Sequence, residues 1–296
     1  MRTASSRWTV VCEGLGFPEG PTFDSNGVLH VTEIANGRVS RIEHGRRTTF
    51  AEPGGGPNGA AWGPDGALYV ANNGGLLFID GYPKGKHPDN DGGRIERITP
   101  DGAVERLYVE CDGEPLAAPN DLVFDAHGSF YFTDPLFGTR VERPPGHVYY
   151  ASADGSNIRR VDTGFALSNG IGITDDGSTL IVCESISRRL LAMDIVGPGK
   201  LGSRRTLCRL PDEHMPDGFA FDADGNILCA GVNGGAVCVY DGAGGFLERI
   251  PTEDIDPTNC AFGGPDQRTL FLCEGRLGRV VALDWERPGM SLFPAR

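Results

Sequence analysis

The sequence predicts an all-β fold, a six-bladed β-propeller formed as one domain over residues 1–296. One polar position recurs six times, and each time a short apolar stretch, a turn and a second apolar run follow it. The six segments are Pro18-Glu19-Gly20, Pro57-Asn58-Gly59, Pro119-Asn120-Asp121, Ser168-Asn169-Gly170, Pro216-Asp217-Gly218 and Thr258-Asn259-Cys260. A strand-turn-strand repeat of roughly 40 to 50 residues is typical of a β-propeller, in which each repeat supplies one blade.

Each repeat contains a turn and a returning strand after the polar position. The first five turns end in glycine, as in Asp24–Gly27 and Asp125–Gly128, and the sixth, Gly264–Gln267, is looser. The 44 glycines and 21 prolines fit many tight turns. No segment has sustained helical apolar spacing, so we expect almost no helix.

The N-terminal run Trp8–Cys12 precedes the first repeat and has no blade of its own. We expect it to form the outer strand of the last blade, whose third strand is Arg279–Asp284. Such pairing would join the two ends of the ring and remove an open sheet edge.

The six recurring polar residues, called the slot residues below, predict a site. If the first strand of each repeat is the innermost strand of its blade, all six begin at the same mouth of the central channel. They are Glu19, Asn58, Asn120, Asn169, Asp217 and Asn259. Two carboxylates and four amides form a ring of oxygen acceptors. We therefore expect one divalent cation there, Ca²⁺ first because it accepts six to eight oxygens in loose geometry, with Zn²⁺, Mn²⁺ or Mg²⁺ left open.

A second set of polar residues follows the slot residues by fourteen or fifteen positions. The six positions are Glu33, Asn72, Asp134, Glu184, Gly231 and Glu274, of which all but Gly231 are polar. Because the returning strands end at the same mouth, we expect these side chains to line a polar pocket above the ion, with Asp134 contacting the substrate. We expect His147, after the loop at 144–146, to contact the substrate as well, the alternative being a surface histidine. The polar insertion at 81–93 is expected to overhang the mouth.

Charge and cysteine usage exclude several classes of partner. The net charge is −13, and arginine pairs are scattered rather than gathered in one track, which argues against nucleic acid and anionic membranes. No apolar run approaches 18 residues and the N-terminus has no secretory pattern. The eight cysteines are isolated among apolar residues, as buried free thiols are, so we expect a cytoplasmic protein. The oligomeric state is not predicted.

Six segments resemble the regucalcin/gluconolactonase family of six-bladed propeller lactonases, in the family's order and over nearly the whole chain. They are Phe17–Pro21, Ala118–Leu122, Tyr131–Pro135, Leu167–Ile171, Met215–Phe219 and Thr258–Gly263. The resemblance implies one divalent cation at the channel mouth, with Glu19, Asn169 and Asp217 as ligands. It implies that Asn120 is a ligand or orients the substrate, and that Asp217 is the catalytic base or nucleophile. The insertion at 81–93 and the segment 137–145 depart from the family pattern, which leaves the substrate open.

The expected activity is metal-dependent hydrolysis of a small lactone, a sugar-acid lactone or a related cyclic ester. The cation would polarise the carbonyl, Asp217 would assist the attack of water, and Asn58, Asn120 and Asn259 would donate hydrogen bonds to the substrate. Two alternatives remain. One is phosphotriesterase or arylesterase activity at the same ion, as in the related diisopropyl fluorophosphatase and paraoxonase, and the other is a non-enzymatic calcium-binding propeller.

Overall fold

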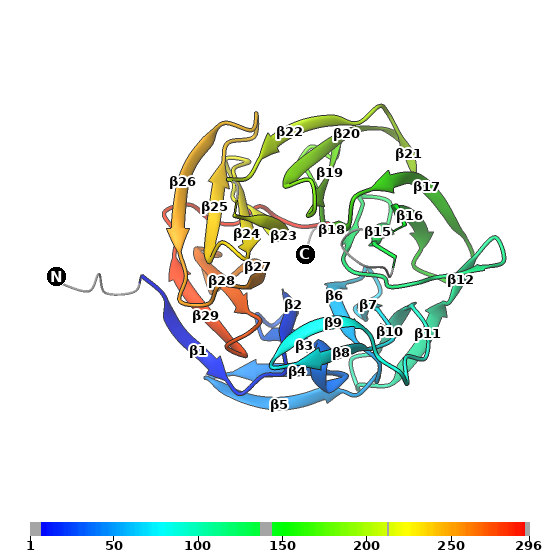
Figure 1. Cartoon of the computed structure of the whole chain (residues 1–296), viewed down its shortest axis with the longest axis horizontal. Helices are drawn as coiled ribbons and strands as arrows, with labels where there is room; N and C mark the ends of the chain where they lie inside the picture. Colours follow the sequence, from blue (N-terminus) through cyan, green and yellow to red (C-terminus); the bar gives the residue numbers. More distant parts are fainter. Residues whose placement is uncertain (1–6, 137–143, 212, 294–296) are drawn as a thin grey trace.

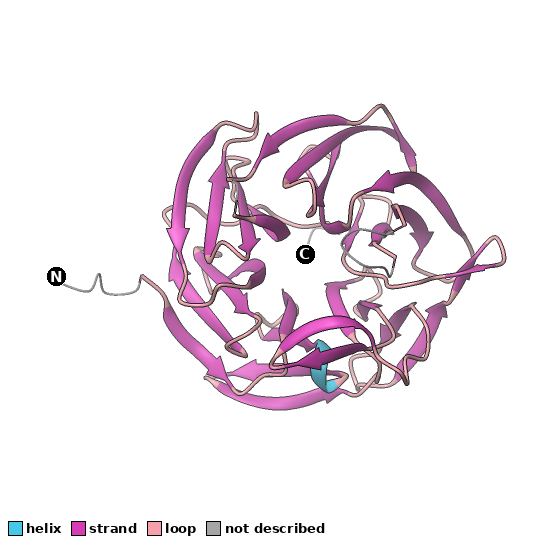
Figure 2. Cartoon of the chain, in the orientation of Figure 1, coloured by secondary structure: helices cyan, strands magenta, loops and turns pink. Residues whose placement is uncertain are grey.

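Six antiparallel sheets, the blades, surround a central channel; five of them have four strands and one has five (Figure 1). The structure is a computed structural model that describes residues 7–136, 144–211 and 213–293. Figure 2 shows that nearly all of the described chain is strand or loop, with one short 3-10 helix, η1 (Ile34–Asn36). The fold is therefore all-β with six blades, as the repeat predicts. Within the described part of the chain, no helix is long and apolar enough to cross a membrane.

Blades 1 and 2 show how the repeat becomes a blade. From the axis outward, blade 1 consists of β2 (Pro18–Phe23), β3 (Leu29–Glu33), β4 (Arg38–Glu43) and β5 (Arg46–Ala51). Blade 2 consists of β6 (Pro57–Trp62), β7 (Leu68–Asn72), β10 (Arg94–Ile98) and β11 (Val104–Tyr108). The turns between first and second strands carry the Asp-Gly and Pro-Asp-Gly signals, because glycine adopts the positive φ that such turns need.

Blades 3 and 4 keep the same order with local additions. Blade 3 consists of β14 (Leu122–Phe124), β15 (Ser129–Asp134), β16 (Gly146–Ser152) and β17 (Ile158–Phe165). Blade 4 consists of β18 (Ser168–Ile173), β19 (Thr179–Glu184), β20 (Arg189–Gly197) and the outer strand β22 (Arg205–Arg209), with β21 (Lys200–Leu201) as a short extension beside β20. A two-stranded ribbon of β12 (Glu110–Cys111) and β13 (Glu114–Pro115) links blades 2 and 3.

Blades 5 and 6 close the ring. Blade 5 consists of β23 (Met215–Phe221), β24 (Ile227–Val232), β25 (Ala236–Tyr240) and β26 (Phe246–Pro251). Blade 6 consists of β27 (Pro257–Gly263), β28 (Thr269–Glu274), β29 (Arg279–Asp284) and the N-terminal strand β1 (Thr9–Glu13). The pairing of β1 with β29 covers the outer edge of β29 and ties the start of the chain to its end.

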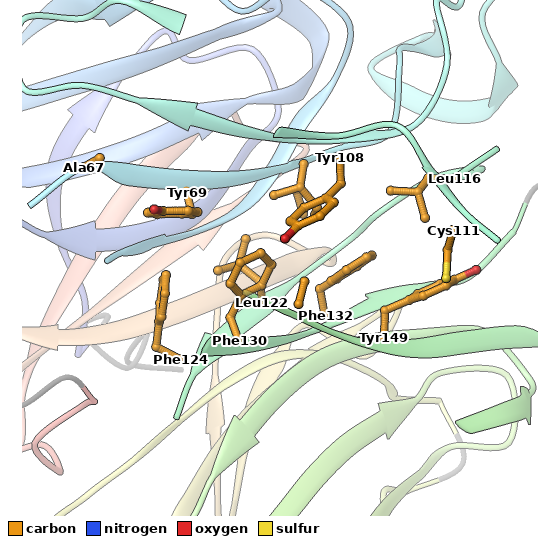
Figure 3. Close-up of a cluster of buried hydrophobic side chains, with 13 residues drawn as sticks. Ala67, Tyr69, Tyr108, Cys111, Leu116, Leu122, Phe124, Phe130, Phe132 and Tyr149 are labelled. Carbon is orange, nitrogen blue, oxygen red and sulfur yellow. The ribbon is translucent and has the colours of Figure 1, made fainter. Parts of the chain in front are cut away.

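The hydrophobic core lies between neighbouring blades. The largest cluster of buried side chains, between blades 2 and 3, has thirteen members, among them Tyr69, Phe124, Phe130 and Tyr149 (Figure 3). The cluster between blades 1 and 2 has only six. All eight cysteines are buried and unpaired, as the sequence predicts.

The insertion in the second repeat forms a hairpin of β8 (Leu76–Ile79) and β9 (Tyr82–Lys86). It leaves blade 2 just beyond the end of β7 and returns at the start of β10. In Figure 1 the hairpin, drawn in cyan, crosses in front of blade 1, and β8 contacts η1. The second strand of each blade ends beside the start of the first strand, which carries the slot residue. The hairpin follows the end of β7, so it lies on the same face as the slot residues.

Candidate functional site

The slot residues lie at a ring formed by the inner strands. Each of β2, β6, β14, β18, β23 and β27 contacts the inner strand of both neighbouring blades, so the six strands enclose the axis. In five blades the pairing of first and second strands shifts register at the slot, for example between Glu19 and Thr22 and between Pro216 and Phe219. Such a bulge redirects a side chain out of the regular alternation of a strand. The bulges thus account for a ring of polar residues inside an otherwise apolar barrel.

Side-chain hydroxyls fix the backbone of the slot residues to neighbouring blades. Thr32 Oγ1 donates to the carbonyl oxygen of Asn58 at 2.5 Å, and Thr133 Oγ1 donates to that of Asn169 at 2.8 Å. Two further contacts of this kind are Ser185 Oγ to Pro216 O at 2.7 Å and Thr258 Oγ1 to Pro18 O at 2.9 Å. Because each bond crosses between blades, the slot residues keep their relative positions.

The position after the slot residue is glycine in four of the six repeats, for a steric reason. A Cβ atom on Gly20 would collide with the backbone of Asn58, one on Gly170 with that of Asp217, and one on Gly218 with the Asn259 side chain. Glycine here allows each slot segment to lie against the next one around the ring. The recurring Asn-Gly and Asp-Gly pairs are therefore packing features of the site rather than turns.

Asp121 is a site residue that the sequence reasoning missed. It occupies the position after the slot in blade 3, where four other repeats have glycine. A Cβ atom on Gly59 would collide with the Asp121 carboxylate, so this carboxylate lies against blade 2. The side chain of Asn259, in blade 6, interacts with both Asp121 and Glu19, so Asp121 faces the same part of the ring as Glu19. Asp121 therefore adds a third carboxylate to the ring, and the replacement of glycine by aspartate was the signal for it.

The electrostatics of the ring are those of crowded carboxylates. Burial raises the pKa of Asp121 to about 7. Burial also raises the pKa of Glu19, and the Asp121 charge adds to this effect. Burial, followed by the charges of Glu19 and Asp121, raises the pKa of Asp217 well above its usual value. Negative charges that lie close together and away from water disfavour one another's ionisation. The raised pKa values of the three carboxylates therefore indicate that no cationic side chain compensates their charge.

The donor set fits a hard cation. No slot residue is Lys, Arg or His, and the Oδ1 atom of Asn58 is buried without a hydrogen-bond donor. Among the described residues, no three His, Cys, Asp or Glu side chains could hold a metal ion by themselves. A cation would thus need amide oxygens as well as carboxylates, which is the mixed oxygen set that Ca²⁺ accepts.

The second set of polar residues has a different role from the predicted pocket rim. Glu33 is fully buried and accepts hydrogen bonds from Arg38 Nε at 2.7 Å and from Gly16 N at 2.7 Å. Glu184 accepts hydrogen bonds from Arg189 Nε at 2.5 Å and from Ala166 N at 3.0 Å. Glu274 likewise pairs with Arg279 and accepts from Asp254 N. These carboxylates, called the bracing carboxylates below, hold the chain that leads into each slot.

Asp134 and His147 both contact other parts of the chain. Asp134 is fully buried, and its carboxylate accepts hydrogen bonds from the backbone of Ala117 at 2.8 Å and Ala118 at 2.9 Å. Backbone donors thus engage both oxygens of this carboxylate, and a substrate contact by Asp134 stays a prediction. His147 lies on the third strand of blade 3, with Nδ1 2.8 Å from Thr163 Oγ1. A substrate contact by His147 stays a prediction.

An apolar contact joins the hairpin to the slot ring. The ring centroids of Phe17 and Phe78 lie 5.2 Å apart. Phe17 precedes Glu19 by two residues and has a positive φ of 55°, a conformation that costs a bulky residue energy and is often kept at functional sites. A Cβ atom on Gly275 would also approach the Phe17 ring, so this ring lies over the mouth end of blade 6. The Phe17–Phe78 pair thus forms an apolar wall beside the carboxylates.

Known proteins with this architecture include lactonases and a phosphatase. The diisopropyl-fluorophosphatase of Loligo vulgaris is 29% identical over 317 aligned positions, which cover 97% of this chain and 94% of that protein. The regucalcin of Xenopus laevis is 36% identical, over 63% of this chain and 64% of that protein. The gluconolactonase of Zymomonas mobilis is 27% identical, over 75% of this chain and 61% of that protein. The alignments with the latter two thus span less than two thirds of those proteins.

Solved structures agree in fold. A gluconolactonase from Xanthomonas campestris superimposes with a TM-score of 0.78 and 25% identity, covering 95% of this chain and 89% of that one. A calcium-binding regucalcin from Agrobacterium tumefaciens superimposes with a TM-score of 0.77 and 22% identity, covering 95% and 94%. Residues 17–275 match the SMP-30/Gluconolactonase/LRE-like region. This match includes all six slot residues, and the chain belongs to the SMP-30/gluconolactonase/LRE-like family.

Proposed function

We propose that this protein hydrolyses a small lactone at the slot ring, with one divalent cation, Ca²⁺ first, held by Glu19, Asn120, Asn169 and Asp217. The observation that carries the proposal is the crowding of Glu19, Asp121 and Asp217 on one ring with amides and without a cationic side chain. The family and its named lactonases support the same reaction class. A divalent cation would supply Lewis acidity toward the ester carbonyl.

Different residues of the ring would have different roles in hydrolysis. Asp217 would accept a proton as the oxygen of water bonds to the carbonyl carbon. As the ring C–O bond then breaks, this proton would pass to the leaving ring oxygen, which gives the hydroxy acid and restores the carboxylate. The Asn58, Asn120 and Asn259 amides would donate to the ring oxygen or hydroxyl groups of the substrate. The bonds from Thr32 to the Asn58 carbonyl and from Thr133 to the Asn169 carbonyl hold these two slot residues in place before the substrate arrives, which reduces the cost of orientation.

The test is acid release from a panel of sugar and aliphatic lactones, followed with a pH indicator. Protein stripped with EDTA would be assayed alone and after addition of Ca²⁺, Mn²⁺, Zn²⁺ or Mg²⁺. We expect turnover only with a restored cation. Tight binding of a cation, seen as a rise in Tm, with no hydrolysis of any lactone would contradict the proposal and favour a calcium-binding propeller.

Phosphotriester hydrolysis at the same ring is a second candidate function. It rests on the similarity to diisopropyl-fluorophosphatase, which extends over 97% of this chain. A Lewis acid can polarise a carbonyl oxygen and a phosphoryl oxygen in the same way. The slot ring alone therefore does not distinguish a lactone from a phosphotriester as the substrate. Adding a phosphotriester and a fluorophosphate to the panel, at equal concentrations, ranks them by kcat/KM.

A further inference from the structure

A second cavity lies on the opposite side of the propeller from the slot ring. It has a volume of about 520 Å³ and lies between blades 1 and 2. Its lining includes the turn residues Asp24–Asn26 and Gly63–Pro64, which end the first strands of these blades. The inner strands begin at the mouth and end at these turns, so the cavity is separate from the candidate metal site.

Blade 1 differs from blades 2 and 3 at one position of the second strand, three residues before the last residue of that strand. The residue there is Tyr69 in blade 2 and Tyr131 in blade 3. Tyr69 Oη donates to Ala153 O at 2.9 Å, and Tyr131 Oη accepts from Gly199 N at 3.0 Å. Each tyrosine thus spans the gap to a turn of the next blade, and Figure 3 shows Tyr69 within the core of that gap. In blade 1 the same position is His30, which is shorter.

His30 lies in the wall of the cavity. The side chain is 2% exposed, and its ring lies edge-on to Phe50 at 4.8 Å and to Trp62 at 5.1 Å. Its Nδ1 lies 3.1 Å from the carbonyl oxygen of Val28, so Nδ1 carries the proton and Nε2 is left as an acceptor. Burial lowers the pKa of His30, which favours this neutral form.

The remaining lining defines the character of a ligand. Phe50, Trp62, Pro64 and Pro100 give apolar ring surfaces. Asp24 and Arg41 line the same cavity with opposite charges, so a ligand meets no net charge there. The Nε atom of Arg41 is buried without a hydrogen-bond partner. These features suit an uncharged planar aromatic molecule that presents an N–H or O–H donor to His30.

We propose that the cavity between blades 1 and 2 is a binding site for small neutral aromatic compounds of one or two rings, anchored by a donor to His30 Nε2. The volume lies within the range of ligand pockets, which is roughly 300 to 1,000 Å³. The proposal is independent of the reaction at the slot ring. It predicts a ligand that contacts neither the carboxylates nor a cation.

Indole and 1-methylindole form a matched pair of probes, because they share a ring system and differ in the N–H donor. Isothermal titration of the whole protein should show indole binding about tenfold more tightly, the worth of one hydrogen bond. Amide chemical shifts on addition of indole should change at residues 24–26 and 63–66. Equal affinities, or shift changes confined to the slot ring, would overturn the proposal.

The variant His30→Tyr copies the residue of blades 2 and 3 and should fill the cavity. We expect indole binding to fall at least tenfold while hydrolysis at the slot ring is unchanged. Tyr69→Phe, at the same strand position in blade 2, is the matched control and should keep indole affinity. Unchanged indole binding in His30→Tyr would also overturn the proposal. If His30→Tyr does not fold, the indole pair and the shift map on the unmodified protein still decide.

Discussion

Two sets of buried carboxylates lie at the same mouth of this propeller, and their environments are opposite. Glu33 and Glu184 are as buried as Glu19. Burial alone would raise the pKa of Glu33, but hydrogen bonds from Arg38, Ser40 and Gly16 outweigh it and lower the pKa. For Glu184, hydrogen bonds from Arg189 and Ala166 outweigh burial in the same way. At the slot ring, by contrast, the pKa values of Glu19, Asp121 and Asp217 are raised.

The difference teaches that burial of a carboxylate does not by itself mark a functional site. Each bracing carboxylate forms an ion pair with an arginine of its own blade, so its charge is compensated inside the fold. The slot carboxylates are surrounded by one another and by neutral amides. A partner from outside the chain is therefore expected at the slot ring and not at the bracing positions.

The largest effect should follow from Asp217→Asn. If Asp217 is the base, kcat for the best lactone should fall by about 10² to 10⁴, because an amide cannot accept the proton of water. Part of the cation affinity should remain, since the amide oxygen is still a donor. Stopped assays and a calcium titration measure both quantities. Asp194→Asn, at an aspartate that is 65% exposed and pairs with Arg205, is the control and should leave kcat unchanged. Near-normal kcat in Asp217→Asn would remove Asp217 from the reaction.

The variant Glu184→Gln tests the bracing carboxylates. Loss of the carboxylate leaves Arg189 without its partner, and we expect the free energy of unfolding to fall by about 3 kcal/mol. Because Glu184 lies outside the slot ring, kcat well below the melting temperature should stay within twofold. Urea unfolding and the lactone assay on one preparation give both numbers. A large loss of kcat in a protein of unchanged stability would return Glu184 to the substrate pocket.

The two sets should also respond to pH in opposite directions. A lowered pKa in the fold, as in Glu33 and Glu184, contributes stability above the unfolded value, near 4.3, and this is lost as pH falls through the folded pKa. A raised pKa, as in Asp121 at about 7, opposes folding progressively as pH rises from about 4 to about 7. Metal-free protein should therefore lose stability between pH 5 and pH 8, and saturating Ca²⁺ should restore it mainly at the upper end.

Unfolding curves at several pH values, with EDTA or with Ca²⁺, check this expectation. Glu19→Gln should flatten the upper part of the metal-free profile, because one of the repelling carboxylates is gone. A metal-free profile that rises from pH 5 to pH 8 would show that the slot carboxylates are not in conflict.

The sequence was sufficient for the blades and for the slot ring, because both depend on local signals that recur. The sequence did not reveal the role of the second set of polar residues. Glu33 and Glu184 each pair with an arginine five residues later, Arg38 or Arg189, and nothing in their spacing predicts this pairing. The partners of Asp134 were not predictable for a related reason: they are backbone N–H groups, which carry no sequence signal. Asp121 directly follows Asn120 and was missed because only one residue per repeat was assigned to the ring.

The smallest effect should come from the apolar wall beside the two sets of carboxylates. Phe78 contacts Phe17 from the hairpin, and both rings are half-buried. If this wall packs against the substrate, Phe78→Ala should raise KM by about threefold to tenfold for lactones with an alkyl or aryl substituent, which corresponds to about 0.7 to 1.4 kcal/mol of lost apolar contact. Lactones that carry only hydroxyl groups should change little, because they gain nothing from that wall. Ile79→Ala, at the next and exposed position of the same strand, is the matched control and should leave both KM values unchanged. An equal rise in KM for both kinds of lactone would instead mean that the hairpin acts by closing the mouth, and the Phe17–Phe78 pair would then carry no preference for an apolar substituent.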